Sequence, residues 1–220
     1  MKLIGLLLVL AGAAGAAETY TYWIEPCRHP ESGCEISDAQ LAEWAFAAWH
    51  KGSGGSVDFA KSPLSKARIR LYWAANGSNG LYGETRAIEV DGKRGAELNV
   101  RPALSGLGLK IEEEGTKDRL FRDSVVYLTC LHELGHALGL SHTHQFGDIM
   151  YSFEYGGNIL EYFSRYRRKL RSREDFPAHS GLSLEDQKHM VALYKADGAD
   201  PVSGQSGGGV RKQQSHGNKP

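Results

Sequence analysis

The segment His132–His142, which reads His-Glu-Leu-Gly-His-Ala-Leu-Gly-Leu-Ser-His, constrains the fold of this 220-residue chain more than any other feature. His132 and His136 are four residues apart, so on a helix both imidazoles project from one face. That spacing lets both rings reach one Zn²⁺ ion. Gly139 has no Cβ and can adopt the left-handed conformation that ends a helix. The pattern therefore predicts a helix with two metal ligands and a sharp turn that returns a third.

Two histidines after the turn could supply that third ligand. His142 and His144 are two residues apart, and on an extended chain both would point to the same side. Their spacing alone leaves the choice between them open. Three protein ligands would leave a fourth position for water, as in catalytic zinc sites. Glu133 would then lie beside the ion, where it could take a proton from that water.

The whole string resembles the metzincin signature, HExxHxxGxxH. Metzincins also carry a methionine turn beneath the metal, and Met150, in the run Asp-Ile-Met-Tyr, matches that residue. The short interval from His142 to Met150 and the Gly-Leu-Ser-His run are similar to those of the matrixins. Residues 182–186 and 193–194 resemble the matrixin C-terminal helix. The resemblance favours His142 as the third ligand and Glu133 as the catalytic base.

The resemblance also implies a fold and a reaction. It implies an α+β domain of the metzincin, or zincin-like, type: a twisted mixed β-sheet, a backing helix, a zinc-binding helix and a C-terminal helix. The implied reaction is hydrolysis of peptide bonds in a peptide or protein substrate, with one catalytic Zn²⁺. Extended substrate would lie along an edge strand, expected at residues 96–100. The expected substrate-binding residues are Ala96, Glu97, Leu98, Asn99 and Tyr151.

The chain departs from the matrixin pattern at the metal sites that accompany the catalytic one. Matrixins carry a histidine-bearing structural zinc site upstream of the catalytic helix, but no histidine lies between Ala75 and Asp123 here. We therefore expect a single zinc ion. Calcium could bind the acidic run Glu112-Glu113-Glu114, but such a run is more often a solvated face, so a calcium site has no other support.

The N-terminus is typical of a secretory signal peptide. A positive start is followed by an apolar run from Leu3 to Leu10 and by small residues up to Ala17. The apolar run is too short to span a bilayer, which needs about 20 residues. No other segment approaches that length. We expect a signal peptide at residues 1–17, cleavage near Ala16 or Ala17, and a secreted or periplasmic protein.

The remaining chain is long enough for one domain with a real core. We assign residues 18–195 to the catalytic domain and residues 196–220, which lack apolar residues to bury, to a disordered tail. Lys plus Arg and Asp plus Glu each total 26, so the charge balance gives no sign of a nucleic-acid partner. We expect a monomer whose partner is its substrate.

The three cysteines are compatible with one disulfide in an exported protein. Cys27 and Cys34 are close in sequence and flanked by proline and glycine, which suits a small bridged loop. Cys130 lies in an apolar helical stretch and is expected to be a buried free thiol. The alternative is that all three are reduced, because sequence alone does not fix connectivity.

Apolar periodicity predicts the elements around the site. The expected strands are residues 19–24, 57–59, 67–74 and 95–100. The expected helices are residues 38–50, 124–139 and one that begins at Ser183. Residues 76–83 are expected to form turns, and residues 105–117 a connection rich in glycine and glutamate.

An insertion at about residues 154–180 distinguishes the chain from the matrixin pattern. Residues 158–170 have helical apolar spacing. Beside them lies a basic cluster: Arg165, Arg167, Arg168, Lys169, Arg171 and Arg173. The cluster is either an exosite or lid for acidic substrates or the solvated face of an amphipathic helix. An insertion that closed the cleft would make this a catalytically silent zinc-binding protein. The intact Glu133 argues against that, because a structural zinc site has no need of it.

Overall fold

The computed structural model describes residues 17–75, 82–105 and 107–196. The predicted signal peptide and the predicted tail therefore lie outside the described residues, except for Ala17 and Ala196. Most of the turn expected at residues 76–83 also lies outside them.

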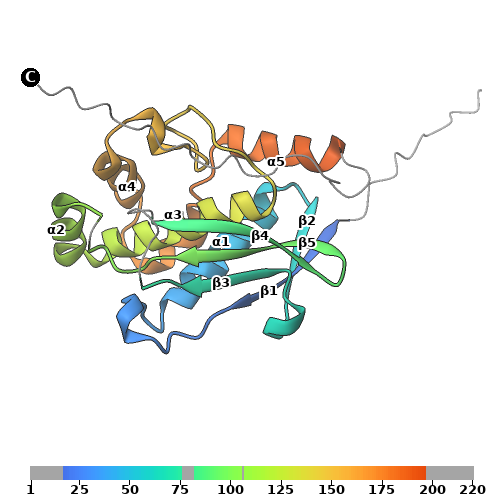
Figure 1. The fold of residues 1–220 in the computed structure, drawn as a ribbon. Helices are drawn as coiled ribbons and strands as arrows, with labels where there is room; N and C mark the ends of the chain where they lie inside the picture. The colour runs from blue at the N-terminus through green and yellow to red at the C-terminus, as the bar shows by residue number, and fades with distance from the viewer. Residues whose placement is uncertain (1–16, 76–81, 106, 197–220) are drawn as a thin grey trace, which may run out of the picture.

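A five-stranded mixed sheet forms one layer of the domain, with the strand order β2-β1-β3-β5-β4 (Figure 1). The strands are β1 (Glu18–Ile24), β2 (Val57–Lys61), β3 (Ile69–Trp73), β4 (Gly83–Val90) and β5 (Lys93–Val100). β1 pairs in parallel with β2 and β3, and β3 pairs in parallel with β5. β4 runs antiparallel to β5. The mixed sheet of the α+β prediction is confirmed.

Strand β4 is not predicted by the apolar pattern of the sequence. A two-residue turn, Asp91-Gly92, joins it to β5, with φ values of 52° and 74°. Positive φ at both positions is typical of the tight turns whose twist suits a hairpin. The hairpin puts β4 at the edge of the sheet and β5 inside it. The prediction of an edge strand at residues 96–100 is therefore wrong, because β5 is hydrogen-bonded to a neighbouring strand on each side.

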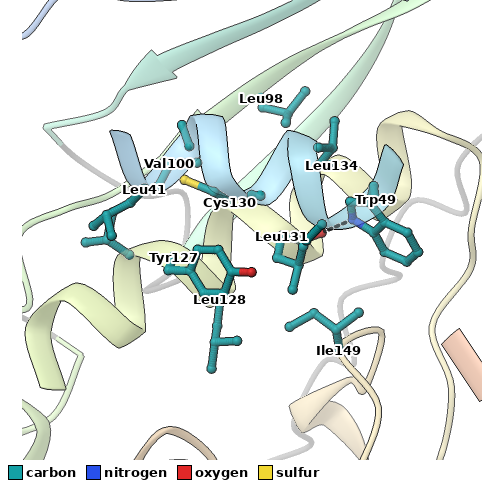
Figure 2. Close-up of a cluster of buried hydrophobic side chains, with 14 of the residues drawn as sticks. Leu41, Trp49, Leu98, Val100, Tyr127, Leu128, Cys130, Leu131, Leu134 and Ile149 are labelled. Atoms are coloured by element: carbon teal, nitrogen blue, oxygen red, sulfur yellow. Dashed lines mark hydrogen bonds between the residues drawn. The ribbon is translucent and has the colours of Figure 1, made fainter. Parts of the chain in front are cut away.

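Two long helices cover one face of the sheet (Figure 1). They are α1 (Asp38–Gly52) and α3 (Arg119–Ala137). Figure 2 shows their shared core, in which Leu41 of α1 and Leu131 of α3 lie with Leu98 of β5, all fully buried. The indole Nε1 of Trp49 donates a hydrogen bond to the Leu131 carbonyl oxygen over 2.8 Å. This contact joins the two helices at the level of the histidine motif.

The other helices are α2 (Leu109–Lys117), α4 (Ile159–Arg167) and α5 (Leu184–Ala196). Short 3₁₀ turns occupy Pro30–Ser32, Leu64–Lys66, Phe153–Tyr155 and Arg173–Ala178. The predicted helices at residues 38–50, within 158–170 and from Ser183 are all present, with small differences at their ends.

Two helical segments differ from the prediction. α2 replaces the connection expected at residues 105–117. It contains Gly115 and has no side-chain cap, but Ile111 is buried, and a Cβ at Gly115 would collide with Leu104. α3 begins at Arg119 and not at Ser124, because the Asp118 carboxylate caps it by accepting from two backbone N–H groups. Tertiary packing explains why α2 forms, and capping by Asp118 explains why α3 begins at Arg119.

The insertion packs into the core through its aromatic face. Its buried members are Tyr162, Phe163, Tyr166, Leu170 and Phe176. Tyr166 stacks on Tyr127 of α3, with ring centroids 5.6 Å apart, and Phe176 meets Tyr127 edge-on at 5.0 Å. The insertion is therefore part of the folded domain and packs against α3.

Most of the basic cluster makes contacts inside the molecule. Arg165 lies over the rings of Phe146 and Tyr162. Three other arginines of the cluster form ion pairs: Arg167 with Asp118, Arg168 with Glu161 and Arg173 with Asp123. This use of the side chains favours a structural role over an exosite.

The predicted disulfide is present between Cys27 and Cys34, and Cys130 is a buried free cysteine. Among the residues described here, no helix has both the length and the apolar character needed to cross a membrane.

Candidate metal centre

The structure brings the Nε2 atoms of His132, His136 and His142 together. The atoms of His136 and His132 are 3.1 Å apart, those of His136 and His142 are 3.1 Å apart, and those of His142 and His132 are 3.3 Å apart. Ligand nitrogens at about 2.0–2.1 Å from a tetrahedral zinc ion would be about 3.3–3.4 Å from one another. The three nitrogens thus have the separation of ligands to one ion.

The other ring nitrogens show which atom carries the proton. His132 Nδ1 lies 2.6 Å from the Ile149 carbonyl oxygen, and His136 Nδ1 lies 2.9 Å from the Leu140 carbonyl oxygen. A carbonyl oxygen only accepts, so Nδ1 carries the hydrogen and Nε2 of each neutral ring keeps a lone pair. Lone pairs that face each other at 3.1 Å repel unless a cation lies between them. The donor set therefore fits a metal ion.

Burial keeps the rings of His132 and His136 neutral at neutral pH. It lowers the pKa of each to about 4, and partial desolvation lowers the pKa of the more exposed His142. Neutral imidazole is the form that binds a metal, so protons compete little for the site near neutral pH. His142 is exposed, which leaves the cluster open to solvent on one side.

The turn after α3 decides which histidine joins the cluster. Gly139 has a φ of 103°, the left-handed conformation predicted for it. The chain then returns, and Thr143 N–H donates to the Met150 carbonyl oxygen over 2.8 Å. His144 instead packs against Tyr155, with ring centroids 3.8 Å apart. Between the two histidines that the spacing left open, the fold brings His142 to the cluster.

Glu133 is buried beside the cluster and is held by an element far away in sequence. Its carboxylate Oε2 accepts a hydrogen bond from the Thr85 hydroxyl over 2.6 Å, and its backbone oxygen lies 3.0 Å from the same hydroxyl. Burial raises the pKa of the Glu133 carboxyl, and the Thr85 hydrogen bond opposes that rise. A raised pKa suits a group that accepts a proton and later returns it.

The turn that contains Met150 is hydrogen-bonded both to α3 and to the start of α5. Ile149, its neighbour, accepts the His132 hydrogen bond described above. The Ile149 N–H donates to the buried Asp186 carboxylate of α5 over 2.8 Å, and the Ser183 N–H donates to the same oxygen, also over 2.8 Å. The C-terminal helix therefore anchors the turn, and the turn anchors one of the clustered histidines.

The residues predicted to bind substrate are not available at a free strand edge. Ala96 and Leu98 are buried in the core. Glu97 forms ion pairs with Arg70 and Arg86 on the other face of the sheet. Tyr151 is buried as well, and its hydroxyl donates to the Gly156 carbonyl oxygen over 2.9 Å. The edge beside Glu133 belongs to β4, which the sequence analysis missed although Asp91-Gly92 is a hairpin signal.

Gly135 gives a first testable prediction. A Cβ at this position would collide with Met150 Sδ and lie 3.1 Å from Trp49 Cζ2. We expect Gly135→Ala to reduce the free energy of unfolding by about 1–3 kcal/mol, because the core has no room for the methyl group. Chemical denaturation of the two proteins measures the difference. Gly147→Ala is the control, since a Cβ there meets nothing within 4 Å. Equal stability of all three proteins would contradict the packing described.

A comparison with family models matches residues 16–159 to the peptidase family described as matrixin. The matched stretch contains the whole sheet, the three clustered histidines, Glu133 and Met150. Comparisons with curated proteins and with solved structures found no significant match.

Proposed function

Because the chain belongs to the matrixin family, we propose that it is an exported zinc-dependent endopeptidase. The observation that carries the proposal is the convergence of three neutral imidazole nitrogens beside a buried carboxylate. A zinc site that only stabilises a fold is closed by a fourth protein ligand, whereas a catalytic site keeps a position open. Among the described residues the cluster has three candidate ligands, as a catalytic site requires.

Each residue of the site has a proposed role in peptide hydrolysis. His132, His136 and His142 would hold one Zn²⁺, which when bound supplies an electrophile that acidifies water and polarises a carbonyl group. Glu133 takes a proton from the attacking water and later delivers it to the amide nitrogen as the C–N bond breaks. Burial raises the pKa of the Glu133 carboxyl, which suits a group that first accepts a proton and then donates it.

We propose that the substrate lies extended along β4. An edge strand has backbone N–H and C=O groups on one side that no strand occupies, and an extended peptide can pair with them. β4 is such a strand among the described residues, and its residue Thr85 contacts Glu133. Residues 96–100 of β5 have no free edge for the substrate, because β3 and β4 flank them.

Export is part of the proposal. The N-terminal sequence has the order of a secretory signal, and the Cys27–Cys34 bridge suits an oxidising compartment, either the periplasm or the extracellular space. We also propose that the protein binds one zinc ion, that it is a monomer and that its catalytic domain ends at residue 195.

A catalytically silent zinc-binding protein is the alternative. It would need the insertion to close the site. The insertion instead packs on Tyr127 of α3, and His142 stays exposed, so both observations favour the peptidase.

Digestion of casein by the purified mature protein tests the function. We expect cleavage that stops when a zinc chelator is added and returns when zinc is restored. Failure of the zinc-loaded protein to cleave casein and a mixed peptide library would favour the silent binding protein.

A further inference from the structure

Strand β4 carries small residues where it approaches α3. Gly83 and Thr85 pair with Val100 and Leu98 of β5, and both of these partners are buried in the core. A Cβ at Gly83 would lie 2.7 Å from both Cγ and Oε1 of Glu133. The edge strand therefore lies directly against the Glu133 side chain, and only small residues allow that approach.

The contact from Thr85 is well suited to fixing that side chain. Threonine is branched at Cβ and has few χ1 rotamers, and here it sits on a strand paired along its length with β5. Glutamate has three rotatable bonds and would sample several rotamers without a partner. The hydrogen bond of 2.6 Å to Oε2 ties the flexible group to the rigid one.

We propose that Thr85 is a positioning residue of the peptidase: its hydroxyl holds one oxygen of Glu133, so the other oxygen is oriented to accept the proton. The proposal rests on the proposed function. It adds that the strand proposed to pair with the substrate also orients the base. One rigid element thereby sets the position of both.

Thr85→Val tests the role, because valine has nearly the same shape and lacks the hydroxyl. We expect kcat to fall about 10- to 100-fold with KM changed less than about twofold, since misplacement of a catalytic group affects the reaction more than binding. Zinc content should stay at the wild-type level. Thr85→Ser, which restores a hydroxyl, should recover most of kcat. If Thr85→Val does not fold, Thr85→Ala, which removes the hydroxyl without adding bulk, is measured in its place.

A second readout needs neither zinc nor activity. The unfolding equilibrium of the metal-free protein is measured for Thr85→Val in the wild-type and in the Glu133→Ala background. We expect the substitution to weaken folding about tenfold more in the wild-type background, where the buried carboxylate loses its donor. If Thr85→Val changes the unfolding equilibrium constant by the same factor in both backgrounds, the Thr85 hydroxyl does not stabilise the Glu133 carboxylate and the proposal is wrong.

The two proposals can fail separately. An inactive wild-type protein would refute the peptidase, while the unfolding cycle would still test the Thr85–Glu133 contact. An active wild-type protein with unchanged kcat in Thr85→Val would refute the positioning role and leave the peptidase standing.

Discussion

Glu133→Gln is expected to lower kcat for a quenched peptide by about 10²- to 10⁴-fold while zinc stays bound. Glutamine has the size of glutamate, and its side-chain oxygen can still accept the hydrogen bond from Thr85. It does not accept a proton, so the step in which water attacks loses its base. Kinetics and elemental analysis of the same preparation measure the two effects.

Glu112→Gln is the matched control. Glu112 lies on α2, outside the strand proposed to bind substrate, and is exposed, so the same chemical change there should leave kcat within about twofold of the wild-type value. Turnover near the wild-type rate in Glu133→Gln would mean that another group takes the proton.

His136→Ala is expected to reduce the zinc content from about one ion per chain to nearly none after dialysis, because two remaining imidazoles hold zinc poorly. Hydrolysis should disappear with the metal. The stabilisation that zinc provides should disappear too, and it is worth about 4 kcal/mol when free zinc exceeds its dissociation constant a thousandfold. Thermal unfolding with and without zinc measures this loss.

His144→Ala provides the comparison for the ligand assignment. The His144 ring packs against Tyr155 and lies outside the cluster, so this variant should keep its zinc. His142→Ala should lose zinc as His136→Ala does. If His144→Ala loses zinc and His142→Ala retains it, the third ligand has been assigned to the wrong histidine.

The histidine cluster could be predicted from sequence because its geometry is mostly local. His132 and His136 share a helix face by their spacing, and the turn at Gly139 needs only a residue without a Cβ. The one choice that local geometry left open, between His142 and His144, depended on the family resemblance, and the fold agrees with it.

The surroundings of Glu133 could not be predicted in the same way. β4 carries Gly83 and Thr85 where it approaches Glu133, so its first half lacks the alternation of large apolar and polar residues that marks a strand. Its small residues are there because Glu133 and α3 approach closely, and that reason becomes visible only in three dimensions. Without β4, β5 is predicted to be the edge strand, and the contact between Thr85 and Glu133 is not predicted.

The insertion shows the same limit. Its helical apolar spacing predicted α4 correctly, because buried residues such as Tyr162 and Tyr166 repeat at helical intervals. The basic residues beside them gave no sign of their partners. Asp118 and Asp123 pair with Arg167 and Arg173 across about fifty residues of chain, which a local pattern does not reveal.

Titration of zinc into the metal-free protein, with hydrolysis of a quenched peptide as the readout, tests the central claim most directly. If the three clustered histidines form a single catalytic zinc site, activity should rise in proportion to added zinc and stop rising at about one equivalent. Absence of hydrolysis at every ratio, or a rise that continues to two equivalents, would contradict it.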